Sequence, residues 1–256
     1  MATDAIQQNL TSAGTRIRPV NRKLERIFFG GMAILLCVVV VVGFSRSYYF
    51  AGMVRAPLPN ALLHVHGGVM TLWMLLFLVQ TALVSAGRVA WHRTLGTVAF
   101  CLPPIMIVLG IVAAIDALKR GVMIGPLDPA VSLAIPLLGM PVFTAVILGA
   151  WLMRRRPDAH KRLILYATIG LCEAAFGRFP WSAMGIAPAG GAVIGLGFLI
   201  VLMLGYDLIS LRRIHRSAMW AAPLTFVEGV LAVPIGMTPV WHSLAGFLAR
   251  WVAPHI

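Results

Sequence analysis

Seven apolar segments, each long enough or nearly long enough to cross a lipid bilayer, constrain this chain more than any other feature. A helical crossing needs about 20 predominantly apolar residues. Of the 256 residues, 60% are hydrophobic and only 11% charged, whereas soluble domains carry about 25% charged residues. The sequence therefore predicts an all-α, polytopic membrane bundle of seven transmembrane helices. The predicted spans are 27–45, 60–86, 94–115, 130–153, 163–184, 190–211 and 217–235.

The net charge of +13 is distributed unevenly between the two sides of this bundle. If the N-terminus is cytoplasmic, most of the basic residues fall in cytoplasmic segments, which is the positive-inside asymmetry of membrane proteins. The cytoplasmic set is Arg16, Arg18, Arg22, Lys23, Arg26, Arg88, Arg93, Arg154, Arg155, Arg156, Lys161, Arg162, Arg212, Arg213 and Arg216. The sequence thus predicts a cytoplasmic N-terminus and a periplasmic C-terminus. These loops suit anionic lipid headgroups, so the charge does not indicate nucleic-acid binding.

The segments outside the spans complete the expected organisation. Residues 1–20 are polar and predict a disordered tail, followed by a single transmembrane domain over 21–256. The segment 240–252 is too short to span, and its Trp241, Leu244, Leu248 and Trp251 recur at helical spacing. That pattern predicts a C-terminal interfacial helix on the outer surface.

Two cytoplasmic loops share one short pattern. Residues 88–95 and 156–163 both read R-x-x-x-H-basic-x-L, and 212–216 is a looser copy. The spans then divide into one helix and three hairpins, 60–115, 130–184 and 190–235. Hairpin repeats of one orientation occur in membrane folds, and a chance match between short basic loops is the alternative.

A wider set of motifs carries a resemblance. The run His66-Gly67-Gly68 is followed by Gln80, by His92-Arg93-x-Leu95-Gly96 and later by His160-Lys161-Arg162-Leu163. This arrangement resembles a group of uncharacterised bacterial multi-pass membrane proteins of unknown function, with His-Arg-x-x-Gly and His-Arg-Arg motifs at cytoplasmic helix ends. The resemblance implies a bacterial inner-membrane helical bundle and no particular activity. A fainter likeness to di-haem cytochromes of the b561 type rests on histidine placement alone.

The cytoplasmic histidines are the first candidate site. His92, His160 and His215 each begin a helix on the same side of the membrane. Two imidazoles can ligate a haem iron axially, and three can hold zinc or copper. The sequence therefore nominates His92 and His160 as ligands of haem b or a transition metal, whose identity it leaves unknown. Their position among arginines also suits helix-end residues that meet lipid phosphates.

A second candidate site lies in the outer half. His64 and His66 are about 200° apart around a helix, so one ion cannot take both, although each remains a cofactor-ligand candidate. Glu173, Arg178 and Glu228 lie within spans, where a charge costs at least about 2.5–3 kcal/mol. We expect Glu173 to face the bundle interior, near His64, His66 or Arg178.

Asp207 lies about one turn inside the cytoplasmic end of the span 190–211. Its expected partner is Arg93, Arg162 or a cytoplasmic histidine, and a structural ion pair is favoured.

Three functions remain open at this stage. The first is a histidine-based redox, haem or metal protein. The second is a small-solute or proton transporter or channel lined by Glu173, Arg178 and Glu228. The third is a non-catalytic scaffold or assembly factor in a membrane complex. The chain contains no nucleophile elbow, phosphate loop or zinc-protease motif, and enzymatic activity is left undecided. The expected partners are the lipid bilayer and either a membrane protein or a second copy of this chain.

Overall fold

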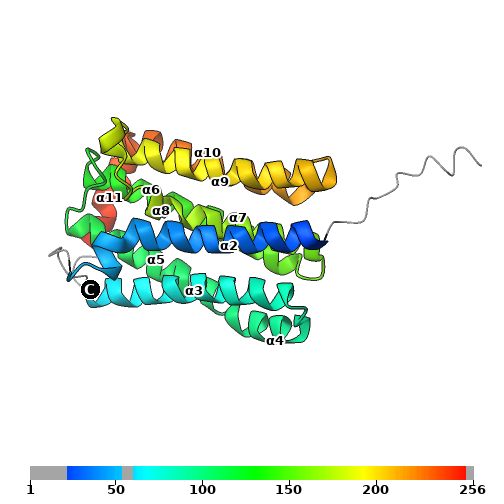
Figure 1. The fold of residues 1–256 in the computed structure, drawn as a ribbon. Helices are drawn as coiled ribbons and strands as arrows, with labels where there is room; N and C mark the ends of the chain where they lie inside the picture. The colour runs from blue at the N-terminus through cyan, green and yellow to red at the C-terminus, as the bar shows by residue number, and fades with distance from the viewer. Residues whose placement is uncertain (1–21, 54–59, 252–256) are drawn as a thin grey trace, which may run out of the picture.

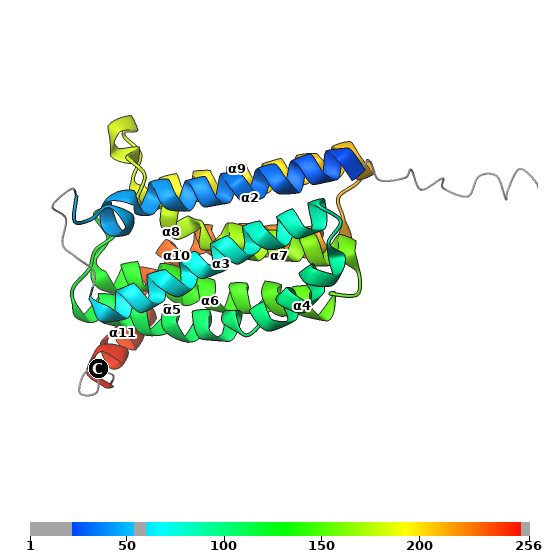
Figure 2. The same ribbon diagram turned by 60° about the horizontal axis from the view of Figure 1, so that its bottom comes forward.

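The computed structural model describes residues 22–53 and 60–251, and the long helices in these ranges run side by side along one axis (Figures 1 and 2). Within these ranges the structure is helical and contains no strand. The predicted disordered tail, 1–20, lies outside the described residues. The elements are α2 (Arg22–Phe44), η1 (Ser45–Tyr49), α3 (Ala61–Ser85), α4 (Val89–Ala99), α5 (Leu102–Lys119), α6 (Pro129–Leu152), α7 (Pro157–Leu171), α8 (Glu173–Phe176), η2 (Trp181–Met184), α9 (Pro188–Leu211), α10 (Arg216–Gly236) and α11 (Pro239–Trp251).

Six helical segments within the described ranges are long and apolar enough to cross a membrane. This confirms the predicted all-helical character for the described residues and supports a multi-pass membrane protein. The predicted count of seven spans is not reached by these criteria. The six segments are Arg22–Tyr49, Ala61–Ser85, Val89–Lys119, Pro129–Leu152, Pro188–Leu211 and Arg216–Gly236.

The predicted span 163–184 is the one that takes a different form. The helix here begins earlier, at Pro157, breaks at Cys172 and ends with α8 at Phe176, so it stops eight residues before the expected end. Pro180, which cannot donate a backbone hydrogen bond, precedes the short 3-10 helix η2. The first turn of α7 is polar, which shortens the apolar stretch below the length of a typical crossing.

Burial explains why α7 tolerates polar residues. It packs against α6, α8, α9 and α10, and Figure 2 shows it in the interior of the bundle behind α3. Its residues from Leu165 to Ile169 are all buried. A helix that is screened from lipid by its neighbours does not need an apolar outer face. Such a helix can carry the buried charges and hydroxyls that form the candidate site described below.

Small residues bring the helices close together. At Gly195 on α9, an added Cβ atom would overlap the Phe176 ring, and at Gly191 it would overlap Trp181. At Gly43 on α2 it would lie 2.5 Å from the carbonyl oxygen of Ala175 on α8. Close backbone approach at small residues is a common mode of helix packing in membranes.

The contact at Gly43 gives a testable prediction. We expect Gly43→Ala to lower the free energy of unfolding by about 1–3 kcal/mol, because the new methyl group meets backbone that cannot move aside easily. Gly31→Ala on the same helix is the control, since nothing lies within 4 Å of its added Cβ. Thermal and denaturant unfolding in detergent would measure both, and equal effects of the two variants would contradict this packing.

The two ends of the bundle differ in composition. Figures 1 and 2 place the start of α2 and the junctions α3–α4, α6–α7 and α9–α10 at one end, which we call the basic end. The junction α5–α6, η2 and α11 lie at the opposite end, which we call the distal end. The loops expected to be cytoplasmic therefore gather at a single end of the molecule.

The C-terminal helix α11 packs partly on protein. Trp241 is buried and its indole Nε1 donates a 2.8 Å hydrogen bond to the carbonyl oxygen of Ala130, while Leu248 packs beside Ala245. Leu244, which we had expected on the same face as Trp241, is 41% exposed. The expected interfacial face is thus divided, with Trp241 and Leu248 turned towards the bundle and Leu244 away from it.

Candidate functional site

A buried ion pair joins α7 to α9 near the basic end. Nη2 of Arg162 lies 2.7 Å, and its Nε 2.8 Å, from Oδ1 of Asp207, and the two side chains are 1% and 0% exposed. The remaining polar atoms also have partners. Arg162 Nη1 donates to the carbonyl oxygen of Asp158, and Asp207 Oδ2 accepts from the backbone N–H of His215. Arg162 was one of three partners expected for Asp207. The pair, with all of these hydrogen bonds formed, holds α7 against α9 and has a structural role.

A more exposed network of ion pairs, next to the buried pair, connects α7 with α2. Lys161 Nζ lies 2.8 Å from Glu25 Oε1 and 2.8 Å from Asp158 Oδ1. The aromatic ring of Tyr206 stacks on Phe28 at a centroid distance of 4.1 Å. Partly exposed ion pairs contribute little stability by themselves, whereas removing one partner of the buried pair leaves an uncompensated charge in the interior.

His215 caps α10 and depends on its neutral form to do so. Its Nδ1 accepts the backbone N–H of Ser217, and a protonated imidazole has no lone pair for this bond. Burial, reinforced by the Arg162 guanidinium, lowers the pKa of His215 below its ordinary range. The cap at the start of α10 is therefore weakened by acid.

The sign of this effect predicts a pH dependence. The pKa of His215 is lower in the folded than in the unfolded protein, so its contribution to stability is complete above about pH 6.5 and is lost as the pH falls through the folded value. We expect the melting temperature to decline on acidification and to decline less steeply in His215→Asn, because asparagine is also a good cap. His64→Asn at the distal end is the matched control. Equal slopes for wild type and His215→Asn would contradict this role.

The structure brings His92 and His160 together. Their ring centroids are 6.5 Å apart and the rings meet edge to face. His160 Nδ1 lies 2.8 Å from the carbonyl oxygen of Ala150, so this nitrogen carries the proton and Nε2 keeps its lone pair. With its amide oriented to satisfy its neighbours, Gln80 accepts the Gly96 N–H and donates to the carbonyl oxygen of His92. Gln80, His92, Gly96 and His160 thus belong to one contact cluster.

His215 is engaged elsewhere, with Asp207 and Ser217. Within the described part of the chain, no group of three or more histidine, cysteine, aspartate or glutamate side chains is arranged to hold a metal ion. A three-ligand zinc or copper site therefore gains no support from this arrangement.

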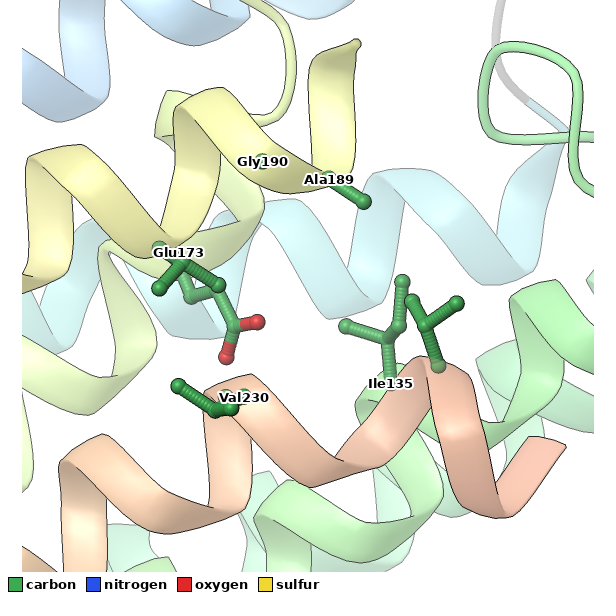
Figure 3. A pocket seen from close by; sticks show the side chains of 8 residues that line it. Ile135, Glu173, Ala189, Gly190 and Val230 are labelled. Carbon is green, nitrogen blue, oxygen red and sulfur yellow. The ribbon is translucent and has the colours of Figure 1, made fainter.

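A cavity in the distal half of the bundle is lined by one carboxylate. Glu173, at the start of α8, is 8% exposed and lines a cavity of about 280 Å³ together with residues of α6, α9 and α10. Figure 3 shows its carboxylate pointing towards α10, close to Val230. The other lining residues are Ile135, Ala189, Gly190, Val193, Gly229 and Val233. A single acid therefore faces an apolar cavity.

Glu228 on α10 lies near enough to Glu173 to interact with it electrostatically. An added Cβ at Gly139 would lie 3.6 Å from Oε1 of Glu228, and one at Gly229 would lie 3.5 Å from Oε1 of Glu173. Oε1 of Glu228 is buried and has no hydrogen-bond partner among the described residues. None of the ion pairs within residues 22–53 and 60–251 includes either carboxylate.

Arg178 and His64, two of the three groups expected near Glu173, are directed elsewhere. The guanidinium of Arg178 lies over the Phe44 ring, 4.4 Å from its centroid, and donates to the carbonyl oxygen of Ala174. His64 is exposed beside Tyr48, and His66 is half-buried. Glu173 faces the interior as expected, but its charged neighbour is the second acid, Glu228.

The helix break at Cys172 separates α7 from α8, and this break was not visible in the apolar pattern.

Two buried hydroxyl groups were not among the residues predicted from the sequence. The side chains of Tyr166 and Thr225 are 0% and 2% exposed, and neither hydroxyl has a hydrogen-bond partner among the described residues. Their spacing was the available signal. Tyr166 follows Arg162 by four residues and Thr225 precedes Glu228 by three, so each shares a helix face with a charged residue.

Comparison of the chain with protein-family models, with curated proteins and with solved structures found no match.

Proposed function

We propose that this protein is a membrane transporter or channel for protons, and that Glu173 and Glu228 form its intramembrane proton-binding site. The observation that carries the proposal is the pair of neighbouring carboxylates, of which Glu173 faces an otherwise apolar cavity and neither has a cationic partner in the described ion pairs. Ionised groups at membrane depth are costly and are retained where they serve a path for ions or protons. A proton is the smallest ligand that removes this cost.

A metal cation fits the same cavity less well than a proton. Calcium takes six to eight oxygen ligands, and magnesium requires a near-octahedral set. Apart from Glu173, the cavity is lined by alanine, glycine, valine and isoleucine side chains. Two carboxylates among such residues provide too few oxygens to replace the hydration shell of a metal ion, whereas one carboxylate is enough to carry a proton.

Reconstitution tests the proposed function. Purified protein would be placed in liposomes that contain a pH-sensitive dye, and a potassium diffusion potential would drive proton entry. We expect faster internal acidification than in empty liposomes, and a rate that returns to the empty-liposome value for the double variant Glu173→Gln, Glu228→Gln. Acidification by wild type at the rate of empty liposomes would refute proton transport.

We further propose that the chain crosses the membrane seven times, with α7 and α8 together as the fifth crossing, and that α11 lies at the outer interface. The polar face of α7 is covered by other helices, which supports a crossing that is too polar to stand alone. Exposed Val240, Leu244 and Phe247 on α11 support contact with the lipid headgroup region. The membrane we propose is the bacterial inner membrane.

The orientation can be tested independently. The clustering of basic loops at one end supports a cytoplasmic N-terminus and a periplasmic C-terminus. We expect a reporter fused after Arg156 to be retained in the cytoplasm and one fused at the C-terminus to be exported. Export of the reporter at position 156 would reverse this orientation.

A second function, haem b or metal binding by a histidine pair, is favoured by one observation. His92 and His160 lie with ring centroids 6.5 Å apart, and the proton on Nδ1 of His160 leaves its Nε2 available as a ligand. We expect any visible haem spectrum or stoichiometric metal in the purified protein to be lost in His92→Ala and in His160→Ala. Purified protein without either signal would rule this function out and leave the proton-transport proposal untouched.

A further inference from the structure

We infer that a water-filled track between α7 and α10 connects the carboxylates Glu173 and Glu228 with the Arg162–Asp207 pair. The hydroxyls of Tyr166 and Thr225 bind the water molecules along this track. This inference rests on the proposed function, since it supplies the route by which a proton would pass between the cavity and the basic end.

The first support is the set of buried polar atoms. Oη of Tyr166, Oγ1 of Thr225 and Oε1 of Glu228 are all buried without a hydrogen-bond partner among the described residues. Buried polar groups in proteins are nearly always satisfied, either by protein atoms or by ordered water, and leaving one unpaired costs about 1–3 kcal/mol. Three such atoms on two packed helices are explained together if water molecules bridge them.

The second support is the order of these groups along the helices. On α7, Arg162 and Tyr166 are four residues apart, and Gly170 follows Tyr166 by another four, which places all three on one face. Thr225 on α10 packs at the level of Gly170, because an added Cβ there would lie 3.4 Å from the methyl group of Thr225. Glu173 follows one turn later.

The rise of an α-helix gives the length of the track along the helix axis. From Arg162 to Glu173 the track spans about 16 Å, at about 1.5 Å per residue, which is roughly half the hydrocarbon thickness of a bilayer. Along the helix axis, the backbone positions of successive groups are separated by about one turn, or 5–6 Å. Two consecutive hydrogen bonds of about 2.8 Å cover a similar length, so one water molecule is the bridge that we infer between neighbours.

The third support is the electrostatic position of Tyr166. Its phenol lies close enough to Asp207 and Arg162 to interact electrostatically with both side chains. At the basic end the pair contacts the backbone of His215, which belongs to the loop between α9 and α10. The track therefore leads from the cavity to a loop at the basic end. A proton would pass along it by hopping between waters and hydroxyls, with each group giving up one proton as it accepts another, so no covalent intermediate forms.

Isosteric removal of the hydroxyls tests the track in two ways. In the liposome assay, Tyr166→Phe and Thr225→Val are expected to reduce proton flux at least tenfold. Tyr48→Phe and Thr144→Val are the controls, because they make the same chemical changes in residues that do not belong to the track, and they should retain wild-type flux. Wild-type flux in both track variants would overturn the inference while leaving proton transport standing.

The second readout is thermal stability in detergent, which does not depend on transport. If the hydroxyls are bridged by water, Tyr166→Phe and Thr225→Val should leave the melting temperature unchanged or lower it, because the bridging water loses a partner. If the hydroxyls are dry and unpaired, both substitutions should raise the melting temperature, since they remove an uncompensated polar group. A rise in both variants would overturn the track. If wild type shows no flux, the proposed function fails, and this stability comparison still decides whether the track holds water.

Discussion

Arg162→Met is expected to lower the free energy of unfolding by about 3–5 kcal/mol, the largest loss we predict for any single substitution in this chain. The side chains of Arg162 and Asp207 are 1% and 0% exposed, so removal of the guanidinium leaves a carboxylate uncompensated in the interior. The variant should denature at a lower temperature in detergent and express poorly. Arg155→Met, at an exposed position of the adjacent loop, is the control and should behave like wild type.

A double variant separates charge imbalance from a loss of packing. In Arg162→Met, Asp207→Leu both charges are replaced by apolar side chains of moderate size, and such replacements of buried pairs are often neutral or stabilising. We expect most of the lost stability to return. A double variant as unstable as Arg162→Met would show that the hydrogen bonds to Asp158 and His215, and not charge compensation, are what the pair supplies.

Glu173→Gln and Glu228→Gln should each reduce proton flux at least tenfold without unfolding the protein. Glutamine keeps most of the shape of glutamate but cannot exchange a proton, so it removes the chemistry while preserving the packing. Because neither carboxylate takes part in the described ion pairs, we expect the melting temperature to stay the same or to rise. Flux and melting curves measured on the same preparations would show this separation.

The opposite pattern would assign these acids a structural role. If Glu173→Gln lowered the melting temperature but retained flux per folded molecule, the cavity would not lie on the transport path. Glu25→Gln is a useful control, because Glu25 contributes to an ion pair at the basic end, far along α2 from the cavity. It should retain flux.

The sequence was most informative where a single physical requirement dominates. Long apolar segments have no alternative to membrane helices, so the helical and multi-pass character was predictable from composition and segment length. The proximity of His92 and His160 followed from equivalent positions at two helix starts, and Arg162 was among the partners foreseen for Asp207. These inferences depend only on which ends of the helices meet.

The features that were missed depend on packing between helices. The break at Cys172 and the end of α8 at Phe176 interrupt an apolar run that gives no local sign of stopping. The orientation of α11 depends on Trp241 reaching the carbonyl oxygen of Ala130, which lies on another helix. Likewise, the charged neighbour of Glu173 could not be read from spacing, because Glu228 approaches from α10 across an interface that only the folded bundle creates.

Infrared difference spectroscopy of the protein in lipid tests the central claim most directly, because it observes the proton on the carboxylates themselves. Spectra would be recorded between about pH 9 and about pH 6, a range in which ordinary carboxyl groups stay ionised, for wild type and for the double variant Glu173→Gln, Glu228→Gln. Proton binding by Glu173 and Glu228 predicts a carbonyl band of a protonated carboxylic acid that appears in wild type as the pH falls through this range and is absent from the double variant. The same carboxylic acid band in both proteins, or its absence from wild type, would contradict the account.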